Sequence, residues 1–303
     1  MTSLERCMAV LDGRMPDTLP VVPQSFMFAV ETAGYKIGEV NRNGRKMAEA
    51  HIVSQEKYGY DGCVIDFDDA TIAEAVGAKV IFRDDEPAIV DEQQPVLKDL
   101  RDVYDMPIPD PMSSGRLSVW LEATERLVEA IGDHVFVMGR ADQGPFSIAC
   151  LLRGTTQFMM DLLTEDPKLI ADVLDYCRRI SAVFAKAQKD AGAHATSIGD
   201  AFAGPNLISP DMYRQFAFEP ERKLVEEVQD YGIPFSVHIC GDTTGIIGDM
   251  GRTGARILEV DWKLDMADPL SSLIQKAHPL SLSQLPIFFF CPEHHAYGTA
   301  PKW

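Results

Sequence analysis

The chain has 303 residues, of which 46% are apolar and 24% charged, and this balance is typical of a globular protein with a substantial buried core. A formal net charge of −18 disfavours nucleic acid as a partner, because affinity for a polyanion comes largely from Lys and Arg. No run approaches the roughly 18 consecutive apolar residues that a membrane span needs. The first residues also lack the basic and apolar segments of a secretory signal. We therefore expect one large domain that binds neither nucleic acid nor membrane and resides in the cytoplasm.

Short β-branched runs alternate with amphipathic stretches along the chain, as in a parallel sheet whose strands are joined by crossover helices. The six predicted strands cover residues 19–24, 63–67, 135–140, 195–200, 234–240 and 256–262. The main predicted helices cover residues 45–58, 118–131, 155–163, 167–191 and 210–231. The last helix has a clear start, because Ser209 is suited to the N-cap and Pro210 to the first helical position.

Polar or reactive side chains follow each predicted strand. They are Gln24, Asp66 and Asp68, Asp142 and Gln143, Asp200, His238 and Cys240, and Asp261. Since ligands bind at the carboxyl ends of parallel strands, these groups predict one pocket at the rim of a (β/α)8 barrel of the TIM type. The alternative is that single Asp residues only cap helices or form turns.

The sequence changes character near its end. After Asp268 the single acidic residue is Glu293, whereas the last 35 residues contain five prolines and the apolar run 287–290. We therefore divide the chain into a barrel domain over residues 1–268 and an atypical tail over residues 269–303. The tail is either an altered terminus that leaves the barrel incomplete or an unusual ending of a complete one.

The six cysteines are spread over the chain, without the density of a disulfide scaffold, and are expected to be thiols. Within Ser236-Val237-His238-Ile239-Cys240, His238 and Cys240 lie two residues apart on a predicted strand, so both side chains point to the same face. An imidazole and a thiolate on one face are half of a zinc site. A core histidine beside an inert buried cysteine is the other interpretation.

Several motifs together resemble the methylcobamide:coenzyme M methyltransferases and related proteins of the uroporphyrinogen decarboxylase superfamily. They are Gln143-Gly144-Pro145-Phe146, Leu151-Leu152-Arg153-Gly154, Ile198-Gly199-Asp200, the stretch from Leu207 to Tyr213, and His238-Ile239-Cys240-Gly241. The similarity runs from about Ser3 to Asp268.

This resemblance implies transfer of a methyl group from a methylated corrinoid, carried by a separate corrinoid protein, to a thiol such as coenzyme M. In those enzymes a His-x-Cys pair and a distant cysteine bind Zn2+, which activates the acceptor thiol. The pair corresponds to His238 and Cys240, and Cys291 is the one later cysteine, although its surroundings do not match the family pattern. The resemblance leaves the acceptor open, and a homodimer is one possible assembly.

Further residues are assigned roles on this basis. Asp68 and Asp200 are the candidate catalytic carboxylates, and Gln24, Asp66, Gln143, Tyr213 and Asp261 are candidate substrate-binding residues. Each also has a structural interpretation, since Asp200 and Asp261 could cap helices or orient metal ligands, and Tyr213 could be a packing residue.

Three alternatives to a thiol methyltransferase remain. Asp68 keeps the spacing of the carboxylate that would bind pyrrole NH groups in a uroporphyrinogen decarboxylase-like lyase, but residues 23–28 lack that enzyme's arginine-rich motif. A metal-free corrinoid methyltransferase with a non-thiol acceptor is a second alternative. The third is a barrel that the altered tail leaves incomplete and catalytically silent, and that either binds a ligand or associates with another chain that supplies the missing face.

Overall fold

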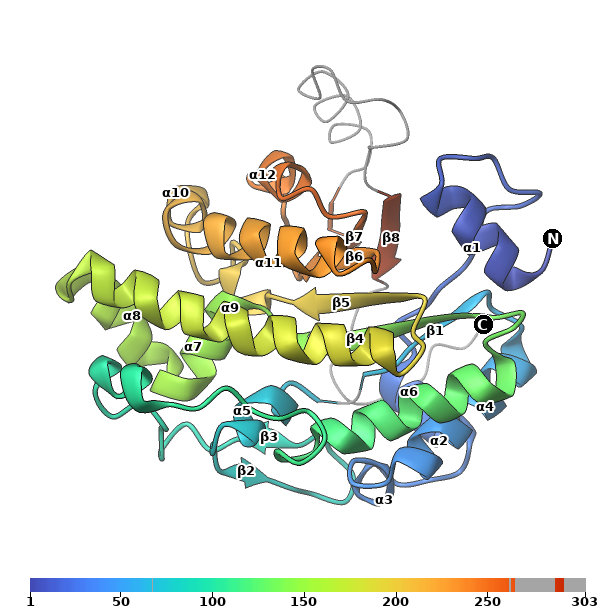
Figure 1. Ribbon diagram of the computed structural model, residues 1–303, viewed down its shortest axis with the longest axis horizontal. Helices are drawn as coiled ribbons and strands as arrows, with labels where there is room; N and C mark the ends of the chain where they lie inside the picture. The colour runs from blue at the N-terminus through green and yellow to red at the C-terminus, as the bar shows by residue number, and fades with distance from the viewer. Residues whose placement is uncertain (67, 262, 265–286, 292–303) are drawn as a thin grey trace.

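The core of the protein is a parallel sheet of six strands that follow one another in space in the order of the sequence (Figure 1). The computed structural model describes residues 1–66, 68–261, 263–264 and, as backbone alone, 287–291. The strands are β1 (Gly62–Val64), β4 (Phe136–Gln143), β5 (Ala195–Gly199), β6 (Phe235–Ile239), β7 (Ile257–Asp261) and β8 (Ile287–Cys291). A sheet in which each strand pairs with its sequential neighbour has the connectivity of a (β/α) barrel.

Helices precede and connect the strands. They are α1 (Ser3–Leu11), α2 (Phe26–Thr32), α3 (Ile37–Val40), α4 (Gly44–Tyr58), α5 (Thr71–Ala75), α6 (Leu117–Ile131), α7 (Pro145–Arg153), α8 (Thr155–Thr164), α9 (Pro167–Asp190), α10 (Pro210–Met212), α11 (Phe218–Asp230) and α12 (Ile247–Arg252). In Figure 1, α9 runs along β4 and β5, and α4 and α6 lie side by side below them. A small antiparallel hairpin, β2 (Val80–Ile81) with β3 (Ile89–Val90), lies outside the main sheet.

The two faces of the sheet bury different sets of side chains. On β4, Val137 belongs to the large apolar cluster between sheet and helices, whereas Phe136 and Met138 pack with Cys7 and Leu11 of α1 in a second cluster. Because side chains alternate along a strand, this second cluster marks the inner face. Helix α1 thus provides an apolar floor at the amino ends of the strands, and the polar strand-end residues lie on the same face farther along.

Five of the six predicted strands are confirmed, with ends that differ by at most three residues. The prediction of a strand at residues 19–24 is wrong, because these residues form no ladder of backbone hydrogen bonds with another strand. The amide of Asp61 donates to the Val21 carbonyl at 2.7 Å, but the Val21 amide donates to the Asp61 side chain instead. Pro20 and Pro23 have no amide hydrogen to offer a neighbouring strand, so the pairing cannot extend.

The backbone of β8 lies within the segment that the sequence divides off as a tail. It pairs in parallel with β7, from Ile257 opposite Ile287 to Asp261 opposite Cys291. The division at residue 268 stays a prediction, and residues 265–286 and 292–303 lie outside the described part. No helix among the described residues is long and apolar enough to cross a membrane.

The predicted helices are confirmed, but the one at residues 210–231 is interrupted. After α10 the chain makes a π-helical turn over Tyr213–Ala217 before α11 begins at Phe218. Such a turn inserts one residue into the helix and changes the direction of the side chains that follow. Ser209 is the N-cap, as its hydroxyl accepts from the Met212 amide at 3.2 Å.

Loss of this cap should destabilise the protein. We expect Ser209→Ala to lower the free energy of unfolding by about 1 kcal/mol, because the first helical amides lose their side-chain acceptor. The conservative control Ser209→Thr keeps a hydroxyl and should stay closer to the wild type. Urea denaturation followed by circular dichroism measures both, and equal stability of the alanine variant and the wild type would contradict the assignment.

Candidate active site

The predicted pocket residues meet on the inner face of the sheet around one buried guanidinium, that of Arg140. Arg140 lies on β4 and is 2% exposed. Its Nε donates to Asp66 Oδ2 at 3.1 Å, and its Nη2 lies 3.5 Å from Glu259 Oε2. Arg140 therefore links the end of β1 to the inner face of β7, two strands that are not neighbours in the sheet.

The two carboxyl groups beside Arg140 respond to it differently. Burial raises the pKa of Asp66 to about 8, because the Arg140 charge only partly offsets desolvation and Asp69 and Asp68 add negative charge. For Glu259, burial acts in the same direction, but Arg140, His238 and hydrogen bonds from Ser236 and Gln24 together lower its pKa. The guanidinium thus lies between one carboxyl whose pKa is raised, Asp66, and one whose pKa is lowered, Glu259.

His238 and Cys240 lie side by side on the inner face at the end of β6. His238 Nε2 is 2.9 Å from Cys240 Sγ, and His238 Nδ1 is 3.1 Å from the Glu259 carbonyl oxygen. A hydrogen bond from Nδ1 to that carbonyl would direct the Nε2 lone pair toward the thiol. Burial raises the pKa of the half-buried Cys240 thiol to about 11, so its sulfur binds a metal ion only after losing a proton.

These two side chains fit two of the three protein ligands that a catalytic zinc site takes. Among the described side chains, no group of three His, Cys, Asp or Glu residues converges in a way that could hold a metal ion. The side chain of Cys291, the third predicted ligand, lies outside the described part. Its backbone pairs with Asp261, which follows Val260, the partner of Ile239 on β6.

Asp68 is held by an arginine that the sequence did not single out. Arg116 Nη1 donates to Asp68 Oδ2 at 2.6 Å and Nη2 to Oδ1 at 3.0 Å, in a buried bidentate pair. The Ala70 amide and the Thr71 hydroxyl donate to Oδ1 as well. Both carboxylate oxygens of Asp68 therefore already accept hydrogen bonds from the protein itself. A carboxylate bonded in this way is suited to positioning its neighbours.

Asp200 lies at the end of β5 and caps α7. Its carboxylate accepts from the Ser147 amide at 2.7 Å and from the Phe146 amide at 3.3 Å. Burial raises the pKa of Asp200 to about 6, against the hydrogen bonds from Ser147 and Phe146. The geometry is that of a carboxylate at a helix N-terminus.

Tyr213 lies in the protein interior. It is fully buried, and its hydroxyl donates to Glu221 Oε2 at 2.5 Å. Burial and the neighbouring Asp200 raise the pKa of Glu221 well above its usual range. Tyr213 is the first residue of the π-helical turn, and its predicted substrate-binding role stays a prediction.

The end of β4 carries a bulge. The register with β5 shifts between Arg140 and Gln143, and Asp142 has φ 59°, a left-handed conformation that a residue with a side chain seldom adopts. Asp142 Oδ2 accepts from the Ile72 amide at 2.6 Å, and Gln143 Nε2 donates to Asp69 at 2.6 Å. Strained residues of this kind cluster at functional sites.

The remaining predicted residues, Gln24 and Asp261, border the same region. Gln24 Nε2 donates to Glu259 Oε2. Asp261 Oδ2 accepts from the Gly241 amide at 2.8 Å, which holds the loop after Cys240. Gln24, Asp66, Gln143, His238, Cys240 and Asp261 thus share one end of the sheet, whereas Asp68, Asp200 and Tyr213 are engaged in the surrounding framework.

Sequence reasoning missed Arg116, Glu259 and Glu221. The sequence does contain a sign of the role of Glu259. It lies two positions before Asp261, within residues 257–260, which are otherwise apolar, and a charged side chain in such a strand is expected to be buried and paired. Arg116 and Glu221 had none, because their partners lie on other elements.

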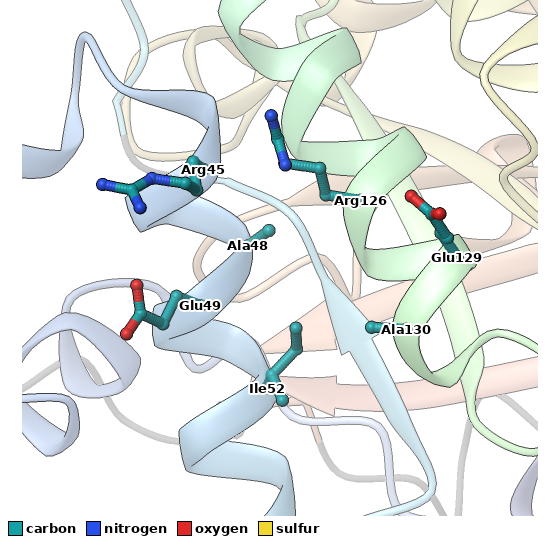
Figure 2. Close-up of a pocket in the computed structure, with 7 residues that line it drawn as sticks. All are labelled: Arg45, Ala48, Glu49, Ile52, Arg126, Glu129 and Ala130. Carbon is teal, nitrogen blue, oxygen red and sulfur yellow. The ribbon is translucent and has the colours of Figure 1, made fainter.

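A separate surface pocket of about 370 Å³ lies between α4 and α6 (Figure 2). Arg45 and Glu49 come from α4, and Arg126 and Glu129 from α6. None of the predicted site residues lines it. It is a groove between two helices on the outside of the barrel, away from the strand ends.

The raised pKa of Asp66 predicts a specific pH dependence of stability. A carboxyl whose pKa is higher in the folded than in the unfolded protein destabilises the fold as pH rises from about 4 to about 8. We expect Asp66→Asn to remove this loss, so that the stability difference, wild type minus variant, falls across that window and is flat outside it. Urea denaturation between pH 4 and 9 measures it.

The exposed carboxyl Asp85 provides the control, since Asp85→Asn should change the free energy of unfolding by less than about 0.5 kcal/mol at any pH. A stability difference for Asp66→Asn that does not vary with pH would contradict the assignment.

Comparison with known proteins agrees with this geometry. A model of the family described as "Uroporphyrinogen decarboxylase (URO-D)" matches residues 2–279. The methylcobamide:CoM methyltransferase MtbA of Methanosarcina mazei is 27% identical over 270 residues, 88% of this chain and 78% of that protein. MtaA of Methanosarcina barkeri, another methylcobamide:CoM methyltransferase, is 26% identical over 265 residues, 86% of this chain and 75% of that protein. A uroporphyrinogen decarboxylase of Streptomyces coelicolor is 36% identical, but over 118 residues, 39% of this chain and 31% of that protein.

The solved structure of a methyltransferase from Methanosarcina mazei superposes with a TM-score of 0.84, at 24% identity, over 96% of this chain and 93% of that one. This match confirms the TIM-type barrel. The expectation of an enzyme is confirmed too, because the matched relatives are methyltransferases and decarboxylases. With the family model covering most of its length, the chain belongs to the uroporphyrinogen decarboxylase family.

Proposed function

We propose that the protein transfers a methyl group from a methylated corrinoid to a thiol acceptor that is activated by Zn2+. The observation that carries the proposal is the pair of His238 Nε2 and Cys240 Sγ, 2.9 Å apart at the end of β6. Similarity to two methylcobamide:CoM methyltransferases over at least 86% of the chain supports the same reaction class. The corrinoid is a co-substrate, presented by a separate corrinoid protein.

His238 and Cys240 would hold the zinc ion, with Cys291 as the proposed third ligand. The support for Cys291 is its pairing with Asp261 on β7, the residue whose side chain accepts from the amide of Gly241, next to Cys240. Bound zinc would stabilise the acceptor as a thiolate at neutral pH.

The protein's own groups would orient this site. The Glu259 carbonyl lies 3.1 Å from His238 Nδ1 and would hold the ring so that Nε2 faces the metal. Asp261 holds the Gly241 amide at 2.8 Å and thereby the loop that follows Cys240. The apolar floor around Phe136 and Met138 excludes water from below. We assign Asp68 and Asp200 positioning roles, since their oxygens accept hydrogen bonds from Arg116 and from the amides of α7.

The charges of the inner face argue against the decarboxylase alternative. Uroporphyrinogen carries many carboxylates, which call for several guanidinium groups free to bind them. The two buried guanidiniums near the strand ends, Arg116 and Arg140, pair with Asp68 and Glu74 and with Asp66 and Glu259. A substrate with many carboxylates would meet an acidic surface there.

The proposal includes a cytoplasmic location, and a homodimer stays a possible assembly. We also propose that the segment beyond residue 268 completes the catalytic end of the barrel through β8. A metal-free enzyme with a non-thiol acceptor is the alternative that metal analysis separates from this proposal.

Zinc content is the first test. We expect about one zinc per chain by mass spectrometry in protein purified without a histidine tag, and loss of that zinc in Cys240→Ala and His238→Ala. Cys7→Ala is the matched control, because Cys7 is a buried thiol in the floor cluster, remote from the strand ends. Zinc-free wild type would overturn thiol activation, and full zinc in Cys291→Ala would exclude Cys291 as a ligand.

Methyl transfer is the second test. With methylcobalamin as donor and 2-mercaptoethanesulfonate as acceptor, we expect a change in the cobalamin absorption spectrum that depends on enzyme. Cys240→Ala should lower kcat/KM at least about 100-fold, because an incomplete ligand set cannot keep the acceptor ionised. Cys7→Ala should retain most of the activity. Decarboxylation of uroporphyrinogen without methyl transfer would favour the alternative.

A further inference from the structure

We propose that Arg214 is a positioning residue for Cys240, on which it acts through the loop that connects β6 to α12. Arg214 lies in the π-helical turn Tyr213–Ala217, between α10 and α11. The proposal rests on the proposed function in one respect, which is that Cys240 is taken to be a metal ligand.

The guanidinium of Arg214 joins the π-helical turn to the loop and to α12. Its Nη2 donates to the Gly245 carbonyl at 3.1 Å, at the end of the loop. Its Nε donates to Asp249 Oδ2 at 2.9 Å, in the first turn of α12. Its Nη1 donates to Asp211 Oδ1 at 2.9 Å, within its own part of the chain. All three nitrogens therefore take part in holding these elements together.

The carboxylate that accepts from Arg214 Nε is buried. The Asp249 side chain is 4% exposed, whereas that of Arg214 is 46% exposed. Arg252, later in α12, donates to the other oxygen of Asp249. Loss of a donor to a buried carboxylate costs more free energy than loss of an exposed ion pair. The Arg214 contact therefore restrains α12 more strongly than its own exposure suggests.

The segment that precedes Arg214 packs against the loop and against Cys240 itself. A Cβ placed on Gly204 would lie 3.0 Å from the Cys240 carbonyl oxygen, and one placed on Gly245 would lie 3.0 Å from Pro210 Cγ. Both distances are closer than most Cβ contacts in proteins, so glycine is what lets these backbones approach. The chain from Gly204 to Arg214 thus lies along the whole loop after β6.

The loop is restrained at both of its ends. Near Cys240, the Gly241 amide donates to Asp261 Oδ2 at 2.8 Å. At the far end, Arg214 holds the Gly245 carbonyl. Removing the second restraint leaves the loop held at its start alone, so a displacement at Gly245 reaches Cys240 through the backbone.

The π-helical turn accounts for the direction of the Arg214 side chain. The preceding residue, Tyr213, is fully buried, and its hydroxyl donates to Glu221 Oε2 at 2.5 Å, which anchors the turn to α11. Arg214, one residue later, faces α12 instead. Turns of this type change the direction of side chains within a helix and are frequent at functional sites.

This arrangement has a consequence for the thiol. Groups that bind a metal ion are held in place by the contacts around them, and the sulfur of Cys240 lies 2.9 Å from His238 Nε2. When the support of Arg214 is lost, the loop should open more often and expose the Cys240 thiol.

The test measures the reactivity of Cys240 in the full chain, treated with a metal chelator so that the result does not depend on zinc. Iodoacetamide labels the thiols, and peptide mass spectrometry gives the labelling rate of each cysteine separately. The buried thiols Cys63 and Cys177 serve as internal references for general unfolding. We expect Arg214→Ala to raise the labelling rate of Cys240 about tenfold and to leave both references unchanged.

Two further variants sharpen the comparison. Arg222→Ala is the matched control, because Arg222 on α11 is similarly exposed, at 35%, and pairs with Glu219 and Glu226. It should leave Cys240 labelling unchanged. Arg214→Lys keeps a positive charge but cannot reach all three acceptors at once, so its labelling rate should lie between those of the wild type and Arg214→Ala. If the alanine variant does not fold, the lysine variant decides the question.

Unchanged labelling of Cys240 in the Arg214 variants would overturn the positioning role. Equal acceleration at Cys63 and Cys177 would overturn it too, because it would indicate a general loss of stability. Selective acceleration at Cys240 in a chain that binds no zinc would support the positioning role and reject thiol activation. Zinc binding together with unchanged labelling would do the reverse.

Discussion

The buried guanidinium of Arg140 is the interaction on which the candidate site depends. It lies inside a barrel whose floor is apolar, and it joins Asp66 after β1 to Glu259 on β7. Removing one member of a buried ion pair typically costs about 3–5 kcal/mol, because the remaining charge is left without a partner. Gln24 and Ser236 also bond Glu259, and the Glu259 carbonyl contacts His238, so one cluster connects the interior of the barrel to the His-Cys pair.

This arrangement places stability and function in opposition at Asp66. A carboxyl with a pKa near 8 weakens the fold as pH rises, and an apolar or amide side chain would remove that loss. When Asp66 is protonated, however, the positive charge of Arg140 is neutralised less than it would be if Asp66 and Glu259 were both ionised. The strained Asp142 in the β4 bulge is a second unfavourable feature close by. Natural proteins keep such features where a site needs them.

Much of the fold was predictable, because period-two and helical patterns are local. The strands near residues 63, 135, 195, 234 and 256 and the helices between them follow from those patterns, as does the cap at Ser209. The strand at residues 19–24 failed because Pro20 and Pro23 outweigh a β-branched pattern. Strand β8 was missed because residues 269–303 carry no amphipathic helix pattern to accompany it, although Ile287–Cys291 is apolar enough to pair with β7.

The sequence by itself determined the class of fold and which end of the barrel carries polar groups, since strand ends and alternation are encoded by neighbouring residues. It placed His238 and Cys240 on one face by their spacing alone. Tertiary structure decided how the carboxylates are used. Asp68 meets Arg116 from 48 positions away, Asp200 caps α7 from 53 positions away, and Arg140 meets Asp66 across 74 positions. Pairings of this kind depend on how helices and strands pack around the barrel, and no local pattern in the chain specifies which charged side chain finds which partner.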